Sequence, residues 1–398
     1  MAAGYWQAGK LRERATFELS IRRLPVSRTY VIVAGVEQAV EYLLGLRFTE
    51  EEIGYLRGLG AFSRVGEGFW DYLRTFRFTG EVWAAPEGTP MFAGEPVMRV
   101  TAPLAEAQIP ETYLLAAVTF QTLIATKASR MVEAARGRPV VEFGTRRAHT
   151  AEAGVLGARA AYIGGCVGTS NAEAGRRFGI PVYGTAAHAW VLAFASEQEA
   201  FARLQELLGE RTVYLVDTYD SEQGVRIAAA LGGAFWGIRL DSGDFLEESR
   251  RARAILDEAG CREAKIMASG DLNEYRIADL VEAGAPIDAF GVGTELATSA
   301  DAPSMGSIYK LVEIDGRPAA KFSAEKPSWP GVKQVFRYPD RDVVGLAEES
   351  HPGATPLLER VTGPASLEAA RKRAEGPVRE RPVVRSERLE ALRRMLKV

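Results

Sequence analysis

Between about residues 138 and 295, short apolar runs alternate with amphipathic stretches, and this repetition limits the possible folds more than any other feature of the chain. Each run opens into Gly, Ser, Thr or Asp, as expected of a buried strand that ends in a loop. Repeated strand–helix units form a parallel sheet covered by helices. The seven predicted strands cover residues 139–143, 161–165, 180–183, 213–216, 235–240, 265–268 and 287–292.

The stretches between these strands carry apolar residues at three- and four-residue spacing, which predicts helices. Several begin at Ser or Asp, which cap helix N-termini, and end at Gly. If the array closes as a barrel, the loops after its strands share the face where such barrels hold their active sites. The predicted helices cover residues 196–208, 221–231, 244–259 and 271–283.

The flanking segments predict a second, smaller unit. Residues 15–22 alternate apolar and polar side chains, and residues 80–100 predict strands punctuated by Gly and Pro. Residues 104–135 predict a long helix that joins the two units, and 398 residues exceed the usual size of a single core. We expect an α+β domain over 1–105, joined by part of 336–398, a β/α barrel over 106–335, and an irregular, helical surface segment over 336–398.

Composition narrows the classes of function. The net charge is −3 and Lys/Arg alternate with Asp/Glu, so nucleic acid is not an expected partner. Cys166 and Cys261 lack the spacing of a zinc site or a disulfide framework. The chain has neither a basic-then-apolar leader nor a run of about 18 apolar residues. We therefore expect no membrane partner and a cytoplasmic location.

Gly-Thr steps follow four of the predicted strand regions, at residues 144–145, 168–169, 184–185 and 293–294. Glycine lets the backbone approach a ligand closely, and the hydroxyl of threonine can bind a phosphate oxygen. The third step leads into His188, one of three histidines in the chain. An imidazole there could be a base, a phosphate ligand or a phosphoryl acceptor, and the spacing does not choose among them.

Further candidates lie at other strand ends. Arg239 offers planar, bidentate donors for a carboxylate or phosphate, and Asp241 could hold ribose hydroxyls or a metal ion. Asp244 in the same segment could be only a helix cap. Residues 269–271 and 293–294 are similar to anion-binding nests that lead into helices.

Phe143 and Arg146 flank the first Gly-Thr step. A ring and a guanidinium in this arrangement could contact a flat anionic substrate. The alternative is a core phenylalanine beside a surface arginine, and the spacing alone leaves both open.

Taken together, five ordered motifs closely resemble the nicotinate phosphoribosyltransferase family. They lie at residues 142–149, 183–188, 237–244, 268–271 and 290–294. The resemblance extends from the first residues to about Arg337. It implies a type II phosphoribosyltransferase: an irregular, TIM-like β/α barrel with an additional α+β open-faced sandwich domain, in a homodimer with shared active sites.

The resemblance also implies a reaction. Nicotinate attacks C1 of phosphoribosyl pyrophosphate to give nicotinate mononucleotide and pyrophosphate, in a step of NAD salvage coupled to ATP hydrolysis with Mg²⁺. ATP is the co-substrate, and His188 matches the histidine that ATP phosphorylates transiently. Ligands of the metal are not assigned.

With the candidates from spacing included, the resemblance predicts two substrate sites. The neutral Ser170 favours nicotinate, because nicotinamide-specific relatives look as if they place a carboxylate there. The predicted nicotinate site comprises Thr185, Arg239, Phe143, Arg146 and Ser170. The predicted phosphoribosyl pyrophosphate site comprises Asp241, Ser242, Gly270, Asp271, Gly293 and Thr294.

Two departures from the family pattern keep alternatives open. Relatives carry a segment resembling Asp-Leu-Tyr-x-Leu-Thr-Met, whose tyrosine reaches the neighbouring subunit's pyridine site, where this sequence starts at Met1. Ala189 stands where many relatives have serine after the histidine. The alternatives are a nicotinamide or quinolinate phosphoribosyltransferase and a non-catalytic binder of nucleotide precursors. A quinolinate enzyme would release CO₂ and would not need a phosphorylatable histidine.

Overall fold

The computed structural model describes residues 1–323 and 325–397, and the chain divides into two compact units. The barrel unit comprises Ile124–Pro303 with Ala374–Pro377. The sandwich unit comprises Met1–Leu123, Ser304–Arg373 and Val378–Val398. These bounds differ from the expected 106–335 for the barrel, because residues 306–314 pair with the N-terminal strand and so belong to the sandwich unit.

The barrel unit is built on a parallel sheet with the strand order β7-β6-β11-β10-β9-β8. A single parallel bridge adds Val182 beside Thr169 at the β7 edge. Among the described residues no strand pairing joins Val182 to β8, so this irregular barrel has a seam between them. The strands are β6 (Val140–Glu142), β7 (Gly168–Thr169), β8 (Val213–Leu215), β9 (Gly237–Leu240), β10 (Lys265–Ser269) and β11 (Ala289–Val292).

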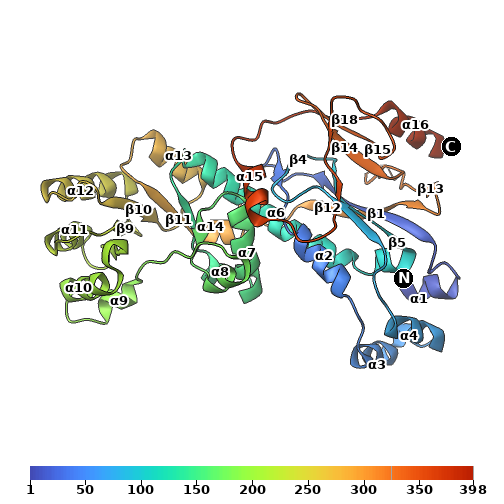
Figure 1. The fold of residues 1–398 in the computed structure, drawn as a ribbon, viewed down its shortest axis with the longest axis horizontal. Coiled ribbons are helices and arrows are strands. Elements are labelled where there is room, and N and C mark those ends of the chain that lie inside the picture. The colour runs from blue at the N-terminus through green and yellow to red at the C-terminus, as the bar shows by residue number, and fades with distance from the viewer. Residues whose placement is uncertain (324, 398) are drawn as a thin grey trace. The chain divides into compact units, whose positions relative to one another are not determined.

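Helices cover this sheet, and α11 and α12 contact β9 (Figure 1). Ser196, Asp220 and Asp244 cap the helices that follow them, which confirms the predicted helix starts. The helix expected from residue 271 begins later, after the cap Asn273. The helices are α7 (Ala151–Ile163), α8 (Ala172–Phe178), α9 (His188–Leu192), α10 (Glu197–Leu208), α11 (Ser221–Ala230), α12 (Phe245–Glu258), α13 (Glu274–Glu282) and α14 (Thr294–Ala297).

Two predicted strands of the barrel unit were wrong or reduced. Residues 161–163 end helix α7, whose C-terminal half is buried from Gly157 to Ile163, so its apolar run has no amphipathic period. A short apolar run cannot distinguish a buried helix from a buried strand. The run at 180–183 forms only the bridge at Val182, beside Pro181, which has no N–H to donate to a ladder.

The sandwich unit is built on an antiparallel sheet with the order β13-β12-β1-β5-β3-β17. Its central strand β1 (Arg14–Arg23) buries Phe17, Leu19 and Ile21 in the largest core of this unit. The other strands are β3 (Glu81–Ala84), β5 (Pro96–Pro103), β12 (Gly306–Ile314), β13 (Arg317–Pro318) and β17 (Glu359–Arg360), with a small ladder of β2 (Val31–Ile32) and β4 (Pro90–Met91).

The C-terminal segment differs from the irregular, helical one expected. Residues 333–385 contribute a four-stranded sheet in the order β16-β14-β15-β18. Its strands are β14 (Lys333–Arg337), β15 (Asp342–Leu346), β16 (Thr355–Pro356) and β18 (Val383–Arg385), and the helices of this segment are α15 (Leu367–Ala374) and α16 (Glu387–Leu396). Each of these strands has five residues or fewer, which is too short for an apolar period to be recognised.

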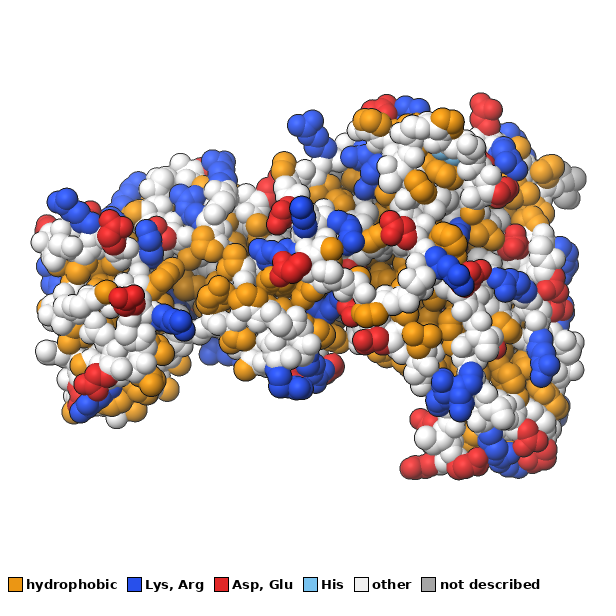
Figure 2. Space-filling model, in the orientation of Figure 1, with side chains coloured by type: hydrophobic (Ala, Val, Ile, Leu, Met, Phe, Trp, Pro, Cys, Tyr) orange, Lys and Arg blue, Asp and Glu red, His pale blue; other side chains and the backbone are white. Residues whose placement is uncertain are grey.

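The N-terminal part of the chain supplies the remaining helices. The single helix expected over 104–135 is interrupted before Pro110, where helices usually end. These helices are α1 (Ala2–Gln7), α2 (Val36–Gly45), α3 (Glu50–Gly58), α4 (Glu67–Arg74), α5 (Leu104–Gln108) and α6 (Glu111–Ala134). Acidic and basic side chains are interspersed on the face in Figure 2. Among the described residues we find no helix that is both long and apolar enough to span a membrane.

Candidate active site

Arg239, in β9, is the centre of a polar cluster at the strand ends of the barrel unit. Its guanidinium donates to Thr185 Oγ1 and to Asp241 Oδ1, and its Nε donates to Ser269 Oγ at 2.7 Å. Ser269 Oγ also donates to Asp241 Oδ1. The loops after three strand regions, at 185, 241 and 269, are therefore joined through one arginine. Thr185, Arg239 and Asp241, predicted separately, lie together.

His188 begins helix α9 at the edge of this cluster. Its Nδ1 lies 3.1 Å from Thr218 Oγ1 and its Nε2 lies 3.7 Å from Asp241 Oδ2. The side chain is 42% exposed, so the ring is accessible while both nitrogens face a polar partner. A hydroxyl on one ring nitrogen fixes the orientation of the imidazole.

Asp241 is held in its ionised form. Burial alone would raise the pKa of this carboxyl, but hydrogen bonds from Arg239 and Ser269, with the charges of Arg239 and His188, lower its pKa. A carboxylate 3.7 Å from His188 Nε2 can stabilise an imidazolium or a bound cation.

Asp217 is a member of the cluster that the sequence reasoning missed. Its Oδ2 accepts from the backbone N of Asp241 at 3.0 Å and from Ser242 Oγ at 2.6 Å. Its Oδ1 is buried and makes no hydrogen bond. Asp217 and Thr218 directly follow the run at 213–216, so their position at a strand end was the available signal.

Glu142 connects the first two Gly-Thr steps. It is 3% exposed and accepts from the backbone N of Gly144 and, at 2.5 Å, from Thr169 Oγ1. Asn171 adds a bond from its side-chain nitrogen to Thr145 Oγ1 at 3.0 Å. Burial raises the pKa of Glu142 although both hydrogen bonds oppose the rise. These two steps are therefore held by one buried carboxylate.

A cavity of about 570 Å³ opens beside Thr185 and Phe143. The guanidinium carbon of Arg239 lies 5.9 Å from the centre of the Phe143 ring. The other wall residues are mostly apolar and include Val141, Met267 and Trp236. A flat ring with one anionic substituent could pack on Phe143 and present that substituent to Arg239.

Close backbone contacts place two of the predicted phosphate-site glycines. A Cβ on Gly144 would lie 2.7 Å from the carbonyl oxygen of Gly293, and a Cβ on Gly270 would lie 2.1 Å from that of Asp241. Gly270 also has a positive φ of 103°, which favours glycine. The loops that carry these glycines therefore adjoin the first Gly-Thr step and Asp241, respectively.

The remaining predicted residues have exposed side chains. Ser170 is exposed, and its backbone N donates to the carbonyl oxygen of Glu142 at 2.9 Å. Arg146, Asp271 and Thr294 are exposed, and no side-chain hydrogen bond or ion pair among the described residues joins them to the other predicted site residues.

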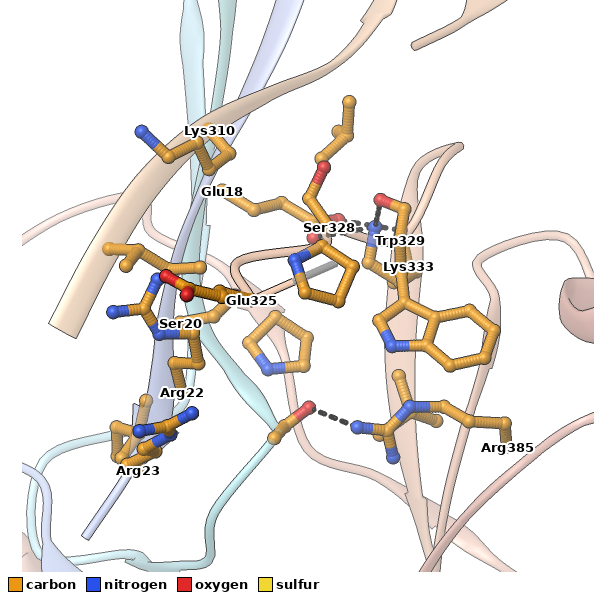
Figure 3. A pocket seen from close by; sticks show the side chains of 17 residues that line it. Glu18, Ser20, Arg22, Arg23, Lys310, Glu325, Ser328, Trp329, Lys333 and Arg385 are labelled. Atoms are coloured by element: carbon orange, nitrogen blue, oxygen red, sulfur yellow. Dashed lines mark hydrogen bonds and ion pairs between the residues drawn. The ribbon is translucent and has the colours of Figure 1, made fainter. Parts of the chain in front are cut away.

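A second cavity, of about 280 Å³, lies in the sandwich unit (Figure 3). Its lining includes Arg22, Lys310 and Arg385, whereas Lys333 is paired with Glu18 at 2.9 Å. Arg385 donates to the carbonyl oxygen of Gly94 at 2.8 Å. None of the predicted site residues lines this cation-rich cavity.

The fit of a metal ion can be tested on the carboxylates of the barrel unit. Among the described residues no group of three His, Cys, Asp or Glu side chains is arranged to hold a metal. Mg²⁺, however, is commonly bound by one or two carboxylates together with substrate phosphates. Asp217, with its unpartnered Oδ1, and Asp241 fit that mode.

Two family models match the chain in succession. Residues 1–119 match the N-terminal domain of nicotinate phosphoribosyltransferase, and residues 124–302 match the C-terminal domain of quinolinate phosphoribosyl transferase. Nicotinate phosphoribosyltransferase pncB2 of Mycobacterium tuberculosis is 48% identical over 372 residues, covering 90% of this chain and 78% of the relative. Nicotinate phosphoribosyltransferase of Bacillus subtilis is 47% identical over 350 residues, covering 85% and 71%.

Solved structures share the fold over nearly the whole chain. Human nicotinic acid phosphoribosyltransferase superposes with a TM-score of 0.87 at 26% identity, covering 100% of this chain and 98% of that one. Nicotinate-nucleotide pyrophosphorylase of Pyrococcus furiosus gives a TM-score of 0.77 at 28% identity, covering 94% and 91%. The expected barrel with an additional domain is thereby confirmed.

Proposed function

This chain belongs to the nicotinate phosphoribosyltransferase family, and we propose that it forms nicotinate mononucleotide from nicotinate and phosphoribosyl pyrophosphate in NAD salvage. The observation that carries the proposal is the cluster in which Arg239 joins Thr185 and Asp241, next to His188 and to the cavity at Phe143. The guanidinium of Arg239, the hydroxyl of Thr185 and the carboxylate of Asp241 therefore lie together near the C-terminal ends of the strands. The Phe143 ring lies beside them.

In the proposed reaction, the pyridine ring packs on Phe143 while its carboxylate accepts hydrogen bonds from Arg239 and Thr185. The ring nitrogen attacks C1 of the ribose, the C1–O bond breaks, and pyrophosphate leaves with the electron pair. Positive charge develops on the ribose ring at the same time, so a nearby carboxylate stabilises the transition state. Asp241, whose pKa is lowered, is suited to that task.

The phosphoribosyl pyrophosphate site is proposed to include Asp241, Ser242, Gly270 and Asp271, with Gly293 and Thr294 at the 5′-phosphate. The tight backbone approach at Gly270 supports an anion-binding turn there. Mg²⁺ would be held by Asp217 and Asp241 together with pyrophosphate oxygens, and would neutralise leaving-group charge.

We further propose that ATP phosphorylates His188. The contact between Nδ1 and Thr218 leaves Nε2 to attack the γ-phosphorus of ATP, with ADP as the leaving group. Later hydrolysis of the phosphoimidazole releases phosphate. A dianion at His188 would reorganise the charges around Asp241 and so couple ATP to substrate binding.

The alternative substrate is quinolinate, because residues 124–302 match the C-terminal domain model of quinolinate phosphoribosyl transferase. The match of residues 1–119 to the nicotinate model and the accessible His188 support nicotinate instead. We also propose a homodimer with shared sites, since large apolar side chains beside His188, including Leu192 and Tyr219, are exposed.

One assay tests the reaction and the role of His188. Purified protein is given phosphoribosyl pyrophosphate, Mg²⁺ and nicotinate, nicotinamide or quinolinate, with and without γ-³²P ATP. We expect nicotinate mononucleotide to form preferentially, with acid-labile label on the wild type and on His149→Ala but not on His188→Ala. His149 is the control because it is an exposed histidine of the same unit.

Each alternative has its own signature in this assay. If product forms from quinolinate with release of CO₂, quinolinate is the substrate in place of nicotinate. Preference for nicotinamide would contradict the assignment of Ser170. Binding of phosphoribosyl pyrophosphate without turnover on any pyridine would support the non-catalytic binder. Unchanged ATP stimulation in His188→Ala would exclude the phosphorylated intermediate.

A further inference from the structure

Lys127 lies in α6 with its side chain fully buried in the barrel unit. Its Nζ lies 2.6 Å from Glu274 Oε2, 2.9 Å from Asp301 Oδ1 and 3.7 Å from Glu295 Oε2. Arg130, one turn further along α6, lies 3.1 Å from Glu274 and 3.3 Å from Asp301. Two cations of one helix therefore contact three carboxylates, of which Glu274 is buried and Asp301 and Glu295 are partly exposed.

The carboxylates come from the loops that follow β10 and β11. Glu274 begins helix α13, shortly after residues 269–271, and Glu295 follows Thr294 directly. Asp301 lies just beyond α14. Since β10 and β11 are neighbours in the sheet, their loops emerge side by side. Lys127 thus contacts acidic side chains that follow both proposed phosphate loops, although it belongs to neither loop.

The charges of this cluster do not favour phosphate by themselves. Glu274, Glu295 and Asp301 contribute three negative charges, and Lys127 and Arg130 offset two of them. Loss of Lys127 would double the net negative charge beside the proposed 5′-phosphate loop. A buried carboxylate that loses its cation also raises the cost of keeping its loop in place.

We propose that Lys127 is a positioning residue for phosphoribosyl pyrophosphate: its buried charge neutralises the acidic cluster and so permits a phosphate dianion to bind at residues 293–294. This inference rests on the proposed function. It predicts that changes at Lys127 and at Glu295 act in opposite directions on the affinity for the phosphorylated sugar, because one removes a positive charge and the other a negative charge near the same loop.

The test compares Lys127→Met, Glu295→Gln and the control Glu282→Gln in the full-length protein. Glu282 lies on α13, as Glu274 does, but its ion pair with Arg136, at 2.7 Å, is exposed. The measurements are KM for phosphoribosyl pyrophosphate, KM for nicotinate, kcat, and the calorimetric affinity for ribose 5-phosphate. Circular dichroism establishes that each variant is folded.

We expect Lys127→Met to raise the KM for phosphoribosyl pyrophosphate by about tenfold, and Glu295→Gln to lower it, with the KM for nicotinate nearly unchanged in both. Glu282→Gln should match the wild type. If Lys127→Met does not fold, the fall in KM and the tighter binding of ribose 5-phosphate in Glu295→Gln carry the test, because a merely structural ion pair would weaken binding when broken.

Suppose that the wild-type protein binds ribose 5-phosphate and turns over. An unchanged or raised KM for phosphoribosyl pyrophosphate in Glu295→Gln would then overturn the role proposed for Lys127, but not the proposed function. An unchanged KM in a folded Lys127→Met would do the same. A wild-type protein that binds neither phosphoribosyl pyrophosphate nor ribose 5-phosphate would instead overturn the proposed function, and the inference with it.

Discussion

At the scale of single residues, the candidate site depends on hydrogen bonds between side chains and backbone of separate loops. Arg239, Asp241 and Thr185 follow recognisable strand regions, and the structure joins them directly. Their supports come from loops elsewhere in the sequence: Asp217 and Thr218 follow β8. The sequence shows that each residue ends a strand, but the pairing between loops depends on strand order and on side-chain rotamers.

A substitution at Thr218 tests whether its hydroxyl orients the His188 ring. Thr218→Val keeps the shape of the side chain but removes the hydroxyl that contacts Nδ1 at 3.1 Å. A lost hydrogen bond of about 1 kcal/mol predicts a fall of about fivefold in the rate of His188 phosphorylation. Rapid-quench measurement of labelled enzyme checks this, with Thr218→Ser as the control that retains the hydroxyl. Equal phosphorylation rates in wild type and Thr218→Val would show that the contact is dispensable.

At the scale of elements, capped amphipathic helices could be predicted well, and buried or short elements could not. Helices α10 and α12 begin at the expected caps Ser196 and Asp244, and α11 begins at the expected residue 221 after the cap Asp220, because capping is a local property of the sequence. Helix α7 was predicted in part as a strand because burial from Gly157 to Ile163 removes its period. Strand β7 has only two residues, and its place in the sheet depends on its neighbours β6 and Val182.

Glu197, the first residue of α10, makes the stability of this region depend on pH. The side chain is 6% exposed, and one of its oxygens is buried without a hydrogen bond. Burial, then the charges of Asp220 and Asp217, raises the pKa of this carboxyl to about 7. Between its ordinary pKa and 7 the folded state binds more proton than the unfolded chain, so this group makes stability fall as pH rises through that range.

Glu197→Gln should remove that dependence. We expect the variant to gain about 2 kcal/mol over the wild type at pH 8, and no comparable gain at pH 4.5, where the wild-type carboxyl is protonated. Urea denaturation of both proteins at the two pH values measures the difference. Glu199→Gln, on the exposed side of the same first turn, serves as the control. A constant difference between wild type and Glu197→Gln across pH would contradict the raised pKa.

At the scale of the whole molecule, local patterns predict that two units exist but not which segments build them. Strand β12, at residues 306–314, completes the sandwich unit by pairing along β1, nearly three hundred residues earlier. The four-stranded C-terminal sheet joins the same unit. Such long-range pairing depends on the packing of the finished core, so the expected limit of the barrel at residue 335 lay beyond the observed one.

The proposed homodimer is supported by exposed apolar side chains near His188. Leu192 is 61% exposed and Tyr219 is 65% exposed, both beside the loops that hold His188. Light scattering should give twice the chain mass of 43.3 kDa. Leu192→Glu should shift the protein to monomers and reduce turnover at low concentration, because a buried charge without a partner disfavours the interface. Glu282→Lys, at a charged and exposed position of α13, is the control expected to remain dimeric. Full activity of a monomeric wild-type protein at nanomolar concentration would refute shared sites, since each copy would then supply every residue that the reaction needs.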